Sequence, residues 1–205
     1  MRWLVTIGAL LAVAASTGFG RAADPRYPDW PCTQAKVPEI SLAAVWAGPP
    51  LDDVLDKWKT DAKVSALVAK SAARRFPLEE AQTAITEFLA AAAPSEKAAT
   101  GKLLFAGLFD TLNAQRSSVM NGLERVTRRQ REAADKIRSD TLALQALQGA
   151  SQPDQAKIDE LGNQLVWETR IFEDRRRVIK FVCEVPTAID HRLFALGRTI
   201  QQEME

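Results

Sequence analysis

The sequence predicts an all-α protein built on a long, coiled-coil-like antiparallel hairpin, with three or four short N-terminal helices packed near its open end. Two helical patterns of similar length, residues 95–148 and 154–205, are separated only by a turn-like stretch at 149–153. Both patterns carry an apolar heptad seam, which is typical of helices that pair with each other. Prolines divide the preceding residues into short segments. Together these observations favour one hairpin with a helical base.

The seam can be followed by stepping alternately by three and four residues. From Phe109 to Leu147 these steps reach twelve positions, nine of which are apolar. From Ile158 to Val182 six of eight are apolar, and the seam resumes after a kink expected at Pro186. A seam sustained over this length indicates a paired helix and not an isolated surface helix.

A fold-back around Ser151 would bring residues whose numbers sum to about 302 level with each other, so that Gln130 meets Phe172. Arg116, Gln130 and Asp140 occupy seam positions, where polar residues often set register, and we expect a structural role for them. At 1.5 Å per residue each arm would be about 75 to 80 Å long. Residues 41–94 are too few to cover such a rod, so its hinge end should protrude.

The first 22 residues have the features of a secretory signal peptide. A positive start at Arg2 precedes an apolar run from Trp3 to Ala15, and a small-residue pattern predicts cleavage between Ala22 and Ala23. A retained membrane anchor is the alternative, but the apolar run is much shorter than the roughly 20 residues of a spanning helix. We therefore expect a periplasmic or secreted protein.

The charge balance of the mature chain does not imply a general affinity for polyanions. Removal of residues 1–22 leaves 183 residues with 25 Lys and Arg against 26 Asp and Glu, a formal charge of −1. No nucleic-acid partner is implied by this balance. The length suits one domain, with or without an extension.

The two cysteines, Cys32 and Cys183, are predicted to form a disulfide, because exported proteins meet an oxidising environment. A redox or metal-binding pair is the alternative. The sequence has no Cys-x-x-Cys spacing, and its only histidine, His191, has no companion ligand. We expect no metal, no cofactor and no catalytic residue.

Residues 23–40 and 41–94 are interpreted separately. Four prolines crowd residues 23–40, so this segment should be extended or turn-like, with its aromatic side chains against the helical body. In residues 41–94 apolar spacing and helix-start signals predict short helices. Their expected ranges are 41–47, 51–58, 62–75 with Asp61 as N-cap, and 77–93.

The hairpin register brings two clusters of basic residues to one height, which we call the basic belt. Such a belt could dock an anionic envelope partner, because clustered arginines offer forked donors to phosphate or carboxylate. A solvated coiled-coil face with ion pairs is the plainer interpretation and is favoured, since exposed pairs contribute weakly. The belt consists of Arg125, Arg128, Arg129 and Arg131 in the first arm and Arg175, Arg176, Arg177 and Lys180 in the second.

The predicted function is that of an exported, non-enzymatic interaction protein: an accessory, scaffold or assembly factor of the cell envelope that uses the hairpin surface. A homo-oligomer formed through the coiled-coil seam is an open possibility. The alternative function is a small-molecule or metal-responsive sensor, with a ligand pocket near the hairpin base around Trp46, Trp58 and Phe105.

Overall fold

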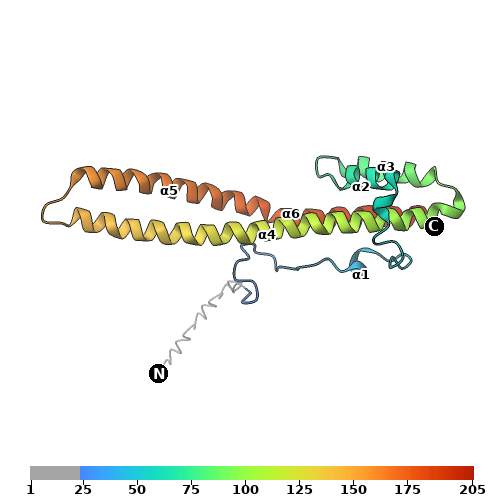
Figure 1. The fold of residues 1–205 in the computed structure, drawn as a ribbon, viewed down its shortest axis with the longest axis horizontal. Coiled ribbons are helices and arrows are strands. Elements are labelled where there is room, and N and C mark those ends of the chain that lie inside the picture. Colours follow the sequence, from blue (N-terminus) through green and yellow to red (C-terminus); the bar gives the residue numbers. More distant parts are fainter. Residues whose placement is uncertain (1–23) are drawn as a thin grey trace, which may run out of the picture.

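A computed structural model describes residues 24–205 of the protein, and the predicted signal peptide lies outside these residues (Figure 1). The described residues form helices, turns and extended segments, with no strand among them. The elements in chain order are α1 (Leu42–Val45), the 3-10 helix η1 (Trp58–Thr60), α2 (Ala62–Ala72), α3 (Leu78–Ala90), α4 (Pro94–Gln148), α5 (Gln155–Val182) and α6 (Glu184–Met204).

The long hairpin is confirmed, and so is its register. Helix α4 has 55 residues and is therefore about 80 Å long, while α5 and α6 return along it in sequence (Figure 1). The side-chain amide of Gln130 donates to the carbonyl of Phe172 at 3.0 Å, and Lys136 lies 2.7 Å from Glu168 across the seam. The first pair has numbers that sum to 302, as the sequence predicts.

The return arm is interrupted at Cys183, three residues before the kink expected at Pro186. Helix α5 ends at Val182 and α6 begins at Glu184, so that Pro186 is the third residue of α6. Proline is tolerated in the first turn of a helix because the N–H groups there have no partner within the helix. The proline therefore marks the start of a new helix, and the break precedes it by one turn.

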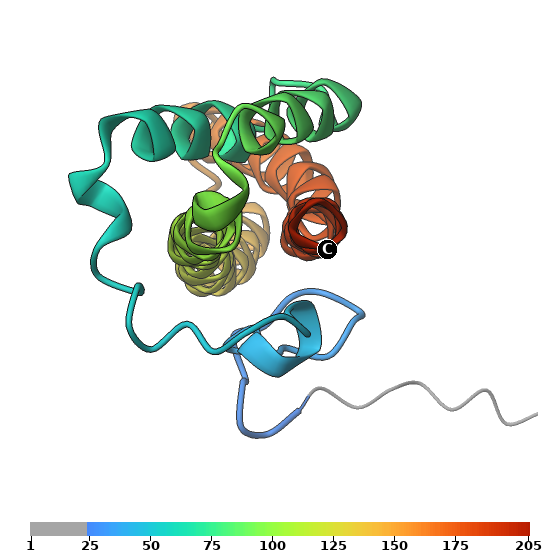
Figure 2. The ribbon, with the colours of Figure 1, turned by 90° about the vertical axis from the view of Figure 1, so that its right-hand side faces the viewer.

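The base of the hairpin has three layers. Helix α2 packs on α4 and α3 packs on α6, while α1 and the N-terminal segment lie on the opposite side of the α4–α6 pair (Figure 2). Helices α4 and α6 approach closely at glycine: a Cβ added to Gly197 would lie 2.7 Å from the Phe105 ring. The largest fully buried side chains, which include Leu51, Ile85, Leu104, Phe105, Leu112, Leu193 and Ile200, are all in this base.

The helix predicted for residues 51–58 is wrong. These residues form successive turns that lead into η1, with Val54 N donating to Leu51 O at 2.9 Å and Lys57 N to Val54 O at 3.0 Å. Leu51, Val54 and Trp58 are nevertheless buried, so the apolar spacing that suggested a helix serves the core. A segment this short takes its conformation from packing, because helix nucleation is costly.

The neighbouring short helices form close to their predicted ranges. Asp61 is the N-cap of α2 and accepts hydrogen bonds from Lys63 N and Val64 N. Helix α2 ends at Ala72 and not at residue 75, before Pro77, which disfavours a helical conformation at the residue preceding it. The buried Arg192 guanidinium binds the carbonyls of Ser71 and Phe76, on either side of this end, at 2.7 and 2.8 Å. Burial lowers the pKa of Arg192. The α2–α3 connection is thus fixed to α6.

The N-terminal segment, residues 24–41, contains no helix and lies along α4, as its prolines predict. Arg116, which is 4 % exposed, donates to the Val37 carbonyl at 2.6 Å and lies 2.7 Å from Asp190 of α6. Lys36 forms a 2.6 Å ion pair with Glu124 of α4. Arg116 therefore has the structural role expected of a polar seam residue, although the groups it binds include the N-terminal segment.

Candidate functional site

The predicted disulfide joins the N-terminal segment to the break between α5 and α6. The Cα atoms of Cys32 and Cys183 are 5.5 Å apart, within the usual range for a disulfide, and the two sulfur atoms are bonded. The Gln34 side chain also donates to the Cys183 carbonyl. The covalent link thus lies where the covered base of the hairpin meets its outer half, residues 121–182.

The structure places all eight residues of the basic belt in the outer half, and all eight are exposed. Two of them hold the N-terminal segment: Arg128 lies 2.9 Å from the Asp29 carboxylate, and Arg131 pairs with the same carboxylate and donates to the Pro28 carbonyl. The hydrogen bond from Arg128, and the charge of Arg131, lower the pKa of Asp29. Asp29 was not foreseen as a partner because it is remote from the belt in sequence.

Five belt cations have no ion pair within the described residues, whereas Arg177 pairs with Asp174 on its own helix. The heptad repeat explains why two of these five cations, Arg129 and Arg175, lack an opposite charge across the hairpin. Lys136 faces Glu168 across the hairpin, and the positions seven residues away are Arg129 and Arg175, so two cations replace the opposite-charge pair. The unpaired cations are Arg125, Arg129, Arg175, Arg176 and Lys180.

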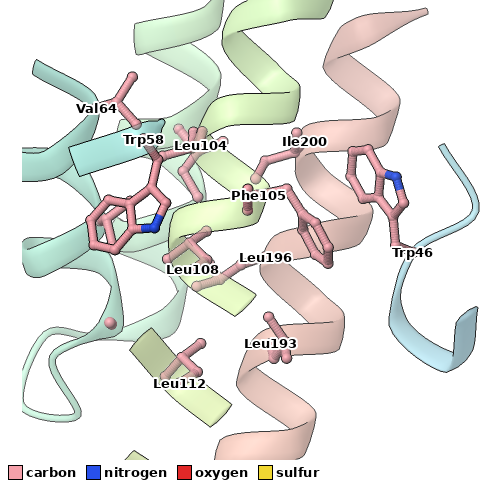
Figure 3. Close-up of a cluster of buried hydrophobic side chains, with 14 of the residues drawn as sticks. Trp46, Trp58, Val64, Leu104, Phe105, Leu108, Leu112, Leu193, Leu196 and Ile200 are labelled. Carbon is pink, nitrogen blue, oxygen red and sulfur yellow. The ribbon is translucent and has the colours of Figure 1, made fainter. Parts of the chain in front are cut away.

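The three aromatic residues predicted to surround a base pocket belong to the hydrophobic core. Trp46, Trp58 and Phe105 are 7 %, 8 % and 0 % exposed. Trp46 stacks on Phe105 with ring centroids 4.2 Å apart, whereas Trp58 lies on the α2 side of α4, away from that stack (Figure 3). All three rings are part of the hydrophobic core, and the two tryptophans do not come together.

A feature that was not predicted is an apolar stripe on the outside of α5. Trp167, Ile171, Val178 and Phe181 are 63 %, 44 %, 58 % and 78 % exposed. They follow heptad spacing, with Asp174 at the intervening position, and are separate from the seam that faces α4. This stripe, which we call the outer stripe, is visible in the sequence as a second heptad pattern over residues 167–181.

The outer stripe continues along the return arm onto the face of α6 that packs against the short helices. The same heptad spacing, continued from Phe181, leads through Val185 to Arg192 and Thr199. Both of these residues contact the short helices: Arg192 binds the α2–α3 connection, and Thr199 accepts a hydrogen bond from Gln82 of α3 at 3.0 Å. Where the stripe meets the short helices there is a largely apolar pocket of 470 Å³. Its lining consists of Arg74, Leu78, Glu184, Val185, Ala188, Ile189, His191 and Arg192.

Residues 24–205 carry neither a metal-ligand cluster nor a membrane-spanning helix. No group of three or more His, Cys, Asp or Glu side chains in this part of the chain is arranged to hold a metal ion. None of the described helices combines the length and the apolar character needed to cross a membrane. The chain matches no protein-family model, no curated protein and no solved structure.

Proposed function

We propose that this protein is an exported, non-enzymatic interaction protein of the cell envelope, and that the outer half of its hairpin docks an anionic partner through the basic belt. The observation that carries this proposal is the group of five exposed cations without ion pairs among the described residues. One heptad further along the hairpin, the corresponding positions hold an opposite-charge pair, Lys136 and Glu168.

The chemistry of the belt supports binding. Guanidinium groups present several donors in a fixed geometry that matches phosphate and carboxylate oxygens. They stay protonated near neutral pH and so do not exchange protons as a general acid or base would. A cluster of such groups attracts and orients an anion.

The rest of the structure supports a docking role outside the cytoplasm. The disulfide between Cys32 and Cys183 is of a kind that persists in oxidising compartments. It also fixes the N-terminal segment at the point where the outer half begins, next to the belt. The base then acts as a rigid support, and the outer half presents its charges to the partner.

Photo-crosslinking in the native envelope tests this proposal. A photoreactive amino acid at Glu173, an exposed position two residues before Arg175 of the belt, should give a discrete adduct. The same group at Arg198, an exposed position on α6 in the base, is the matched control and should give none. Replacing Arg125, Arg175 and Arg176 with Gln should abolish the adduct from position 173.

The nature of the adduct identifies the partner. A discrete protein adduct indicates an acidic protein face, whereas a lipid adduct, together with binding of the purified protein to phosphatidylglycerol vesicles, indicates a phospholipid surface. In either case raising the ionic strength should weaken binding, because the attraction is between exposed charges. The proposal is overturned if position 173 gives no protein or lipid adduct, or if the triple Gln variant gives the same adduct.

A further inference from the structure

The outer stripe of α5 is unusual because it leaves large apolar side chains in water on a helix that has no buried residue within the described structure. Trp167 and Phe181, at its two ends, are 63 % and 78 % exposed. A stripe of this kind on a water-soluble surface commonly marks a place where another molecule binds. Its residue pattern indicates what that molecule is.

The pattern of the outer stripe is symmetric about its centre. In order it has an aromatic residue, an aliphatic residue, an acid, an aliphatic residue and an aromatic residue, and the two ends are each seven residues from the acid. A stripe that reads alike in both directions is self-complementary when two copies lie antiparallel, as a two-fold interface requires. The five residues are Trp167, Ile171, Asp174, Val178 and Phe181.

We infer that α5 pairs antiparallel with α5 of a second copy of this chain through the outer stripe, which forms a two-fold dimer centred on Asp174. Residues whose numbers sum to about 348 are then level. Trp167 of each copy lies at the height of Phe181 of the other, and Ile171 lies within one residue of the height of Val178.

Two observations favour a second helix over a lipid surface as the occupant. The first is Asp174, since a membrane would have to accept a carboxylate at the centre of the apolar stripe. In a helical pair, a polar residue at one core position is a common device that sets orientation and register. The second is continuity, because the same face of the return arm is covered by helices in the base, where Arg192 binds the α2–α3 connection. The two α5 helices must therefore cross at an angle, so that residues 155–163 of the second copy, which are level with 185–193, pass beside this connection.

The charges beside the stripe predict how salt affects the dimer. Asp174 pairs with Arg177 within its own helix, and its side chain is still half exposed. In the antiparallel arrangement Arg175 of the second copy is level with Glu173, and Arg170 of the second copy is level with Val178. Arg170, Arg175 and Arg177 of each copy therefore lie near two carboxylates, Glu173 and Asp174. Arginines then outnumber carboxylates at the centre, so added salt should screen their repulsion and strengthen the dimer.

The size of the stripe indicates a weak dimer. The exposed parts of the four apolar side chains amount to roughly 500 Å² per copy, or about 1,000 Å² in total, from the usual areas of such side chains. This value is at the lower end of specific interfaces. Association should therefore be detected at micromolar or higher concentration.

This inference goes beyond the proposed function and does not depend on it. Arg176 and Lys180 of the basic belt lie on a different face of α5 from the stripe, by about a third of a turn or more, whereas Arg175 and Arg177 of the belt flank the stripe at about a quarter of a turn. The two surfaces also respond oppositely to salt, which should weaken docking of an anionic partner and strengthen the dimer. A failure of the dimer can thus be distinguished from a failure of docking through the basic belt.

Sedimentation of the mature protein provides the first test, over a concentration range on the order of 1 to 500 µM. The native protein should shift from monomer to dimer within this range. Val178→Lys places a charge in the stripe and should weaken association at least about tenfold. Thr169→Lys adds the same charge at an exposed position on the opposite side of α5 and should leave association unchanged. Both variants change exposed residues, and circular dichroism should confirm equal helix content.

Cysteine crosslinking tests the orientation. Under mild oxidation, an equimolar mixture of Trp167→Cys and Phe181→Cys proteins should form a disulfide-linked dimer, whereas each variant alone should form much less. A parallel pair would give the reverse result and would overturn the inference. It is also overturned if the native protein stays monomeric throughout the range, or if it stays monomeric while Val178→Lys abolishes its binding to phosphatidylglycerol vesicles.

Discussion

The base of the hairpin and its outer half use the same heptad spacing, yet they differ sharply in burial. In the base, five consecutive residues of α4, Leu104 to Leu108, are buried, because α2 and α6 cover different faces of the helix. In the outer half, α5 has 28 residues, and among the described residues none of these is buried. A seam between two helices covers one stripe on each and leaves the remaining faces in water.

The helices outside the seam therefore determine which side chains are fully buried and so where most of the stability comes from. Leu165, Phe172 and Ile179 are seam residues of α5, but they are only half-buried. Leu193 and Leu196 of α6 are fully buried because α3 lies over the return arm there. The outer half is therefore available for contacts that the base cannot make.

A substitution in the base should destabilise the protein most. Phe105→Ala should lower the free energy of unfolding by about 3 to 5 kcal/mol, because it leaves a cavity at a fully buried ring. Phe172→Ala in the outer half removes the same atoms from a half-buried position and should cost about 1 kcal/mol. Denaturant unfolding of the two variants measures both. Equal losses would show that the outer half is as well covered as the base.

Removal of the disulfide should have the next largest effect. Replacing Cys32 and Cys183 with Ser should lower the free energy of unfolding by about 2 to 4 kcal/mol, since a link between residues 151 apart restricts the unfolded chain. Denaturant unfolding of the native protein with and without a reductant provides the same comparison without substitution. A loss below about 1 kcal/mol would show that the link contributes little.

Arg116 tests whether a polar seam residue stabilises the boundary between the two regions. Arg116→Met keeps much of the side-chain volume, but it removes the bond to the Val37 carbonyl and the pairing with Asp190. The expected loss is about 2 kcal/mol, because a buried acceptor and a carboxylate lose their donor. Arg125→Met, at an exposed belt position, should change stability by less than about 0.5 kcal/mol. Similar losses in the two variants would contradict this role.

The sequence predicts the hairpin well because its signals are repeated over many residues. The seam, the turn at 149–153 and the pairing of Gln130 with Phe172 all follow from one spacing rule, and an error at one position does not change the others. The helix predicted for residues 51–58 fails for the opposite reason. It is short, and the burial of Leu51, Val54 and Trp58 is satisfied by turns as well as by a helix.

The candidate surfaces were harder to predict, since they depend on which face is left uncovered. The belt residues are visible as clusters in the sequence, but the pairing of Arg128 and Arg131 with Asp29 requires the path of the N-terminal segment. The outer stripe has a clear heptad pattern. Only the structure shows that α2 and α3 stop short of it, so that Trp167 and Phe181 stay exposed.

The smallest expected effect concerns the attachment of the N-terminal segment to the belt at low pH. Because the pKa of Asp29 is lowered in the folded protein, its contribution is fully present above the ordinary value of about 3.9 and is lost as the pH falls through the lowered value. The indole N–H of Trp30, which donates to the Gln34 carbonyl at 2.7 Å, reports on this segment. Its hydrogen exchange, relative to a free indole at the same pH, should therefore accelerate in acid.

Two substitutions separate attachment to the belt from local structure. Asp29→Asn should accelerate exchange of the Trp30 indole already at neutral pH, because the pairing with Arg128 and Arg131 is lost. Asp24→Asn is the matched control, since Asp24 also has a lowered pKa but pairs with Arg26 inside the segment. Asp24→Asn should keep the pH dependence of Trp30 indole exchange that the native protein shows. If Asp29→Asn also kept the native exchange profile, the N-terminal segment would be held by the disulfide and Arg116 alone. Arg128 and Arg131 would then not be bound to this segment in solution.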